Sequence, residues 1–175
     1  MSPLKKNDDV TKAIRSLLKI YHEAAAPETK QWLRSSLTWP IRYLERFVTH
    51  ARVSVKAQEA AGAMDLSQCK WNQQPSLLDD PERELFHYEH MYPVSQMREK
   101  LIELSDPGRE VSEDQIIKEI ESELDKFDIA WVLKEEDNKL NEMGYQSKRP
   151  PNPLDAYREA GIVLLPQDNG GLDGK

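Results

Sequence analysis

The chain has 175 residues, which is enough for one domain with a buried core. Its 38% hydrophobic and 31% charged residues are typical of a globular protein, and no apolar run reaches the roughly 18 residues of a membrane span. The single cysteine, Cys69, excludes an internal disulfide framework and a cysteine-based zinc site, so we expect a cytoplasmic location.

The net charge of −7 is unevenly distributed along the chain. Residues 1–65 carry 11 Lys and Arg against 7 Asp and Glu, whereas residues 66–175 carry 13 against 24. An acidic total argues against a protein that coats nucleic acid without specificity, but it allows an enzyme that contacts DNA through one basic face. We therefore divide the chain into an N-terminal helical region (1–65), a second region (66–165) and a polar tail (166–175) that we expect to be flexible.

The first part of the chain has the apolar spacing of helices. Ile14 and Leu18 belong to a helical pattern that runs from about Asp9 to Ala25. Pro27 ends this helix, because proline disfavours helical backbone angles at the preceding residue. A second, short helix is expected from Glu28 to Ser35.

A single long helix is predicted for residues 38–61. Thr38 is a suitable N-cap, Pro40 fits the first turn and Gly62 lies just past the end. One sector of this helix is apolar and another is cationic, so a buried stripe and a basic ridge would share it. The ridge consists of Arg42, Arg46, Arg52 and Lys56. It is interpreted either as a solvated face or as a surface that contacts phosphates.

The second region alternates between the two kinds of secondary structure. Residues 64–84 are irregular and are expected to form a loop. In chain order we then predict a strand at 84–91, helices at 93–104 and 113–127, a strand at 128–133, and helices at 134–143 and 153–160. The resulting fold class is mainly α with a short two-stranded β element.

The first of these strands ends in a chemically suggestive group. Glu89 and His90 are adjacent, and Pro93 follows. A neutral imidazole is a good general base near pH 7, and a carboxylate can hold a divalent cation. Neighbouring residues of a strand point to opposite faces, so these two serve one site only where the strand ends or bends. A second acid would come from the helix at 134–143.

The stretch "YEHMYPVSQM" resembles the first strand and turn of the HNH nucleases, the ββα-metal or His-Me finger group, in its "EHxxP" pattern. "AWVLKEEDNKL" resembles their second strand and the helix that bears the last metal ligand. The resemblance implies that His90 is the general base and that Glu89 and Asp137 ligate Mg²⁺ or Mn²⁺. It implies a helical domain that carries an enlarged ββα-metal finger within residues 66–165, with the cationic ridge holding DNA. The expected activity is metal-dependent endonucleolytic hydrolysis of phosphodiester bonds in DNA, in a restriction or phage context.

Simpler interpretations stay open for each of these residues. A histidine at a strand end is commonly a structural, hydrogen-bonded residue, and the helix dipole favours an acid such as Asp137 in a first turn. The alternative function is a non-catalytic helical subunit for protein interaction or regulation. Its basic ridge would then meet an acidic protein partner, and the acidic C-terminal half agrees with this. Neither function involves a membrane, and a homodimer is left open.

Overall fold

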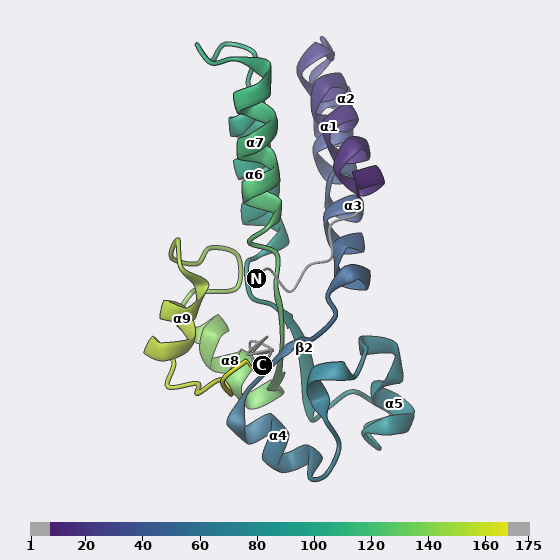
Figure 1. The fold of residues 1–175 in the computed structure, drawn as a ribbon, viewed down its shortest axis with the longest axis vertical. Coiled ribbons are helices and arrows are strands. Elements are labelled where there is room, and N and C mark those ends of the chain that lie inside the picture. The colour runs from purple at the N-terminus through teal and green to yellow at the C-terminus, as the bar shows by residue number, and fades with distance from the viewer. Residues whose placement is uncertain (1–7, 168–175) are drawn as a thin grey trace, which may run out of the picture.

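The computed structural model describes residues 8–167, and the predicted mainly helical character is confirmed (Figure 1). Two groups of helices stand side by side above a smaller body that contains the sheet. The helices of the two groups are α1 (Asp8–Glu23), α2 (Pro27–Ser36) and α3 (Thr38–Tyr43) on one side, and α6 (Val94–Leu104) and α7 (Glu113–Leu124) on the other. The body carries the helices α4 (Val55–Ala61), α5 (Gln74–Leu77), α8 (Lys134–Glu142) and α9 (Pro153–Glu159).

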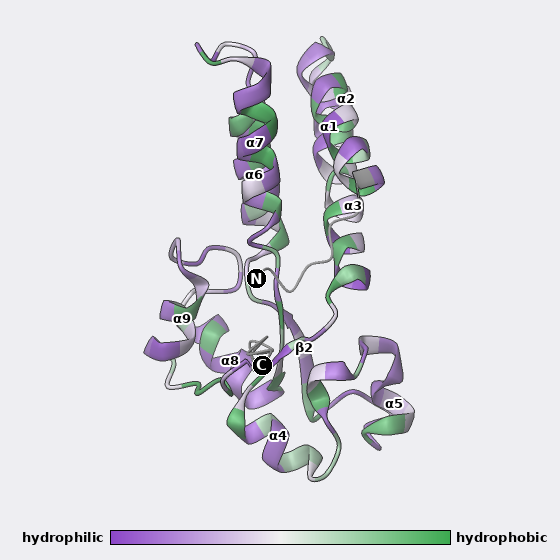
Figure 2. Cartoon of the chain, in the orientation of Figure 1, coloured by the Kyte–Doolittle hydropathy of each residue, from purple (hydrophilic) through white to green (hydrophobic). Residues whose placement is uncertain are grey.

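The helices of both groups are amphipathic, and each packs through one apolar face. Figure 2 shows hydrophobic and hydrophilic residues alternating along α1 and α7 as the helices turn. Ile14 and Leu18 of α1 pack in the same core cluster as Met97 of α6 and Leu124 of α7. Burial of these faces is the main force that joins the two groups, because short helices are marginal alone. The Ser112 side chain caps α7 by accepting a hydrogen bond from the backbone N–H of Gln115.

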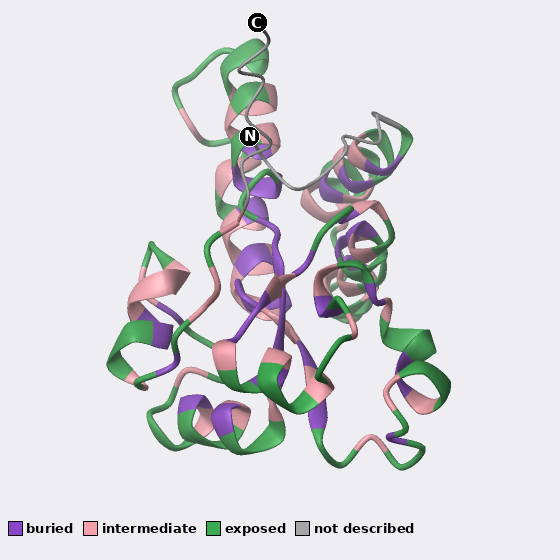
Figure 3. Ribbon diagram, turned by 60° about the horizontal axis from the view of Figure 1, so that its bottom comes forward, coloured by how far each residue is buried: buried purple, intermediate pink, exposed green. Residues whose placement is uncertain are grey.

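The sheet has three strands rather than the two predicted, in the order β1-β3-β2. The central strand β3 (Ile129–Leu133) pairs antiparallel with β2 (Phe86–His90) and parallel with the very short β1 (Arg52–Val53). Four of the five residues of β3 are buried, which agrees with its near-continuous apolar sequence. Figure 3 shows this buried centre, surrounded by helices that carry buried, intermediate and exposed residues. The strand β2 lies at an edge of the sheet.

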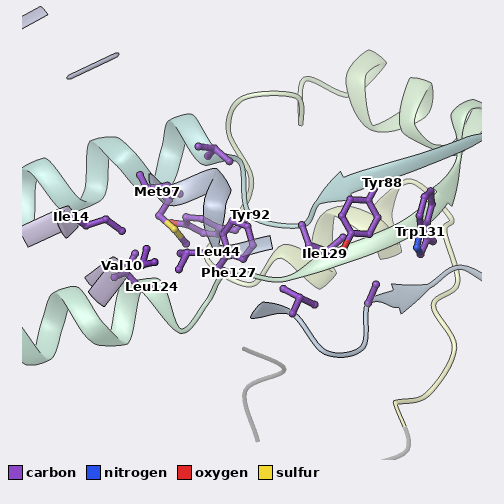
Figure 4. Packing of buried hydrophobic residues seen from close by; sticks show 14 of the residues in the cluster. Val10, Ile14, Leu44, Tyr88, Tyr92, Met97, Leu124, Phe127, Ile129 and Trp131 are labelled. Atoms are coloured by element: carbon purple, nitrogen blue, oxygen red, sulfur yellow. The ribbon is translucent and has the colours of Figure 1, made fainter. Parts of the chain in front are cut away.

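The two faces of the sheet belong to different cores. Tyr88 and Trp131 are cross-strand partners in the larger core, which also receives α1, α3, α6 and α7 (Figure 4). Ala130 and Val132 point the other way, into a smaller core formed with α8 and α9. Residues from both sides of position 65 therefore share the larger core, with Val53 on one side and Phe86 on the other.

The predicted long helix at 38–61 is wrong. The chain instead forms α3, a 3₁₀ turn (η1, Leu44–Phe47), the strand β1 and the helix α4. Val48 has extended angles (φ −67°, ψ 114°), and the Ala51 backbone N–H bonds to the Ser67 carbonyl outside any helix. The β-branched residues Val48 and Val53 explain the break, because such side chains favour extended backbone when they can join a sheet.

The polar segment at 64–84 contains short turns of helix. These are η2 (Leu66–Gln68), η3 (Trp71–Gln73) and α5. The apolar segment after α9 adds an isolated antiparallel bridge between Leu164 and Ser54. Residues 168–175, most of the tail predicted to be flexible, lie outside the described residues. Between residues 8 and 167, no helix combines the length and the apolar character required to cross a bilayer.

Candidate functional site

The strand β2 places its polar residues on two opposite faces. His87 and Glu89 pair across β3 with Val132 and Ala130, so they point toward the smaller core and the helix α8. His90 pairs with Ile129 and points toward the larger core. Glu89 and His90 are adjacent in sequence but lie on opposite sides of the edge strand.

Three side chains meet on the face toward α8. His87 Nε2 lies 2.9 Å from Glu89 Oε2 and 3.9 Å from Asp137 Oδ2. One ligand atom from each of the three residues lies within 4.8 Å of the other two. They meet because His87 and Glu89 are two residues apart in a strand, and because Asp137 occupies the first turn of α8, which packs on that strand. We call these three residues the His-Glu-Asp cluster.

Arg149 supports the cluster from within the protein. Its side chain is fully buried, forms an ion pair with Glu89 and donates hydrogen bonds to the carbonyl oxygens of His90, Met91 and Tyr145. This guanidinium fixes one carboxylate oxygen of Glu89 and ties the end of β2 to the segment that follows α8. It also partly balances the negative charge of the cluster.

The pKa values in the cluster diverge. A hydrogen bond to Glu89 raises the pKa of His87. Burial acts to raise the pKa of Glu89, but the His87 hydrogen bond and the charge of Arg149 outweigh it and leave that pKa lowered. Burial raises the pKa of Asp137, and the charge of Glu89 adds to the effect. Two half-buried carboxylates thus repel one another, which is the electrostatic situation that a bound cation relieves.

The donor set fits a divalent metal ion. One imidazole nitrogen and two carboxylate oxygens form a mixed set: nitrogen suits the first-row transition metals, and oxygen suits Mg²⁺ and Mn²⁺. Three protein ligands leave positions for water or substrate, as in catalytic rather than structural sites. The His87–Glu89 hydrogen bond already holds two of the donors at a separation suited to a shared ligand.

His90 is held in an unusual state. Its side chain is 17% exposed and lies edge-on to the Phe127 ring, with 5.6 Å between ring centroids. The buried Nε2 atom has no hydrogen-bond partner, and the nearest carboxylate oxygen, Glu45 Oε2, is 3.8 Å away. Burial lowers the pKa of His90 to about 4, so the ring is neutral at pH 7. A neutral imidazole with an unpaired nitrogen is the form that accepts a proton.

A cleft of about 650 Å³ runs along the edge of β2. It is lined by the four residues at 87–90, by Arg42 and Arg46 of the N-terminal helices and by Arg98 of α6. Arg42 and Arg46 are exposed, and neither forms an ion pair with another described residue. Both faces of β2 therefore open into one hollow with a basic wall.

The predicted basic ridge is divided by the break in its helix. Arg52 lies in β1 and pairs with Asp128 at 2.7 Å, and Lys56 lies in α4 and pairs with Glu135 at 2.9 Å. Neither residue lines the cleft. Of the four predicted DNA contacts, the structure brings only Arg42 and Arg46 next to β2.

Some site residues were missed in the sequence. His87 could have been found, because the spacing His-x-Glu in a strand places both side chains on one face. Arg149 gave no signal, since it lies in an irregular segment and acts through backbone carbonyls. No protein-family model, curated protein or solved structure matches this chain.

Proposed function

We propose that the protein is a metal-dependent endonuclease that hydrolyses phosphodiester bonds, with its active site at the edge of β2. The observation that carries this proposal is the His-Glu-Asp cluster, two of whose members, His87 and Glu89, line a cleft with a basic wall together with His90 from the opposite face of β2. Taken singly, each of these features also occurs in proteins without catalytic activity. Together around one hollow, a metal-ligand set, a neutral imidazole and unpaired arginines are the parts that phosphodiester hydrolysis requires.

The order of elements supports the HNH resemblance. β2 pairs antiparallel with β3, and α8 follows β3 directly and packs on both strands. The helices α6 and α7 form an insertion between the two strands. The ligands Glu89 and Asp137 come from the first strand and from the helix, as the resemblance implies. We therefore propose an enlarged ββα-metal finger, with His87 as an additional ligand.

The chain's own residues divide the chemistry. Arg42 and Arg46 bind the phosphate backbone and orient it along β2. His90 would take the proton of the attacking water at Nε2, which requires that substrate binding open this buried atom to water. An anionic phosphate beside the ring would raise its lowered pKa toward neutrality. A bound divalent ion would supply charge stabilisation for the phosphate and the leaving oxygen. Glu89, Asp137 and His87 would hold that ion, with Arg149 orienting Glu89.

The imidazole of His87 in the ligand set favours one of the two predicted ions, Mn²⁺ and Mg²⁺, over the other. Mg²⁺ prefers oxygen ligands and retains its waters, whereas Mn²⁺ accepts nitrogen and oxygen and ranks in affinity with the transition metals. Mn²⁺ should therefore bind more tightly than Mg²⁺. Because His87 must lose its proton to bind, affinity should fall as the pH drops through its raised pKa.

Calorimetry and a DNA-nicking assay test the proposal together. Wild type should bind Mn²⁺, and Glu89→Gln and Asp137→Asn should abolish binding and nicking. Glu135→Gln is the matched control, because Glu135 lies on the same helix but pairs with Lys56 outside the cluster. His90→Phe should keep metal binding and lose nicking by at least about 100-fold, the usual contribution of a general base.

Two results would count against the proposal in different ways. If the wild-type protein binds neither Mn²⁺ nor Mg²⁺, the proposed nuclease function is excluded and a non-catalytic interaction subunit is favoured. Undiminished nicking by His90→Phe would remove His90 from the mechanism and leave the metal site.

A further inference from the structure

The cleft beside β2 has a second property that hydrolysis alone does not require. Three aromatic residues on its walls are largely in solvent: Trp39 is 75% exposed, Trp71 is 49% exposed and Tyr43 is 45% exposed. Large aromatic side chains are normally buried, and a concentration of exposed ones marks a binding surface. These residues come from α3 and η3, which are separate in sequence and face one hollow.

The aromatic residues alternate with guanidinium groups. The Arg46 guanidinium lies 4.9 Å from the centre of the Tyr43 ring. The Arg83 guanidinium lies 3.5 Å from the centre of the Trp71 ring, which holds that ring in place on the rim. Trp39 makes no ring or cation–π contact with another residue in the described part of the chain, so its ring is available to a ligand.

The ligand must offer both negative charge and flat apolar faces. Nucleotides provide both, with phosphates for the arginines and bases for the rings. In a duplex the base faces are covered by neighbouring base pairs, so only unpaired or flipped bases can stack on a tryptophan. The cleft volume of about 650 Å³ is in the range that encloses a small molecule, which suits one or two nucleotides rather than a double helix.

We propose that the cleft binds an unpaired stretch of nucleic acid, with bases stacked on Trp39 and Trp71 and phosphates against Arg42 and Arg46. This inference rests on the proposed function, because it names the form of the substrate that reaches β2. A strand held on these rings passes Glu89 and His90, which line the same cleft. The substrate class is thus a single strand, a loop or a frayed junction.

Fluorescence anisotropy tests the inference without any chemistry. A labelled oligothymidylate and a long double-stranded fragment are titrated in EDTA, and binding is compared per nucleotide. Wild type should bind the single strand at least tenfold more tightly. Trp39→Ala should weaken single-strand binding by about 5- to 150-fold, the range for loss of one base stack. Arg46→Gln should reduce the salt dependence by about 0.7 in the log-log slope for single strands.

Trp32→Ala is the matched control. Trp32 is 65% exposed on α2 but does not line the cleft, so its loss should leave binding unchanged. Equal affinity for duplex and single strand, or equal losses in Trp39→Ala and Trp32→Ala, would overturn the inference. A lack of oligonucleotide binding would also overturn the inference and would indicate that the exposed aromatic residues bind a protein partner instead.

The nicking assay keeps the two proposals distinguishable. If the protein cleaves fully paired DNA with metal and shows no preference for single strands in binding, this inference is overturned and the proposed nuclease function stands. Single-strand binding that depends on Trp39, without metal binding by the His-Glu-Asp cluster, would support the binding surface and overturn the nuclease.

Discussion

Acidification from pH 7 to pH 5 should destabilise the protein through His90. The ring is 17% exposed and its Nε2 atom has no hydrogen-bond partner, and burial lowers its pKa from 6.5 to about 4. A group with a depressed folded pKa stabilises the fold above its unfolded pKa, and this contribution is lost as the pH falls toward the folded pKa. Between pH 7 and pH 5 the unfolded chain gains a proton that the folded chain does not bind, so about 2 kcal/mol is lost.

The variant His90→Phe isolates this contribution. Phenylalanine keeps a ring against Phe127 but does not titrate, and no hydrogen bond at Nε2 is lost. Urea denaturation at both pH values should show that wild type loses about 2 kcal/mol more than His90→Phe over this interval. The comparison cancels the other titrating groups, including His87, whose raised pKa acts with the opposite sign. Equal losses in the two proteins would show that the imidazole is hydrated, and its role as a desolvated base would be refuted.

Two further substitutions test the interactions that hold β2 and β3 in place. Arg149→Met should lower the free energy of unfolding in urea by about 3 to 5 kcal/mol, because it removes the ion pair with the half-buried Glu89 and the hydrogen bonds to the carbonyl oxygens of His90 and Met91. Adding Glu89→Gln should recover part of the loss, and a loss below about 1 kcal/mol would contradict this. Ser54→Ala should cost about 2 to 4 kcal/mol, because Ser54 both caps α4 and donates to the buried Glu136 carboxylate. Ser112→Ala removes a cap alone and should cost about 1 kcal/mol, so equal losses in the two serine variants would show that Glu136 contributes nothing.

Local patterns in the sequence predict most of the secondary structure. The apolar spacing of Ile14 and Leu18 identifies α1, and Ser112 marks the start of α7, because each signal lies within the element that it specifies. The long helix failed for the opposite reason. The apolar residues around Val48 fit a helical face, but pairing of Arg52 and Val53 with β3 decides the backbone, and that partner lies more than seventy residues away.

The sequence predicted two members of the His-Glu-Asp cluster and missed His87 and the supporting Arg149. Glu89 and Asp137 were predicted as a pair and lie together, because strand pairing and the packing of α8 follow from the predicted elements. The aromatic wall of the cleft could not be predicted, because the spacing of apolar residues does not distinguish an exposed tryptophan from a buried one. Trp39 and Trp71 are both exposed in the structure. The basic wall depended on where the chain bends after Arg46, which tertiary contacts determine.

The helical hairpin between β2 and β3 has a consequence for how the chain folds. Residues 91–128 separate two strands that must pair in register, and closing a flexible loop of that length opposes pairing entropically. The helices α6 and α7 pack on each other and are close in sequence, so we expect their contacts to form early and to shorten the effective loop between the strands. We therefore expect the hairpin to bring the end of β2 and the start of β3 close together before the two strands pair.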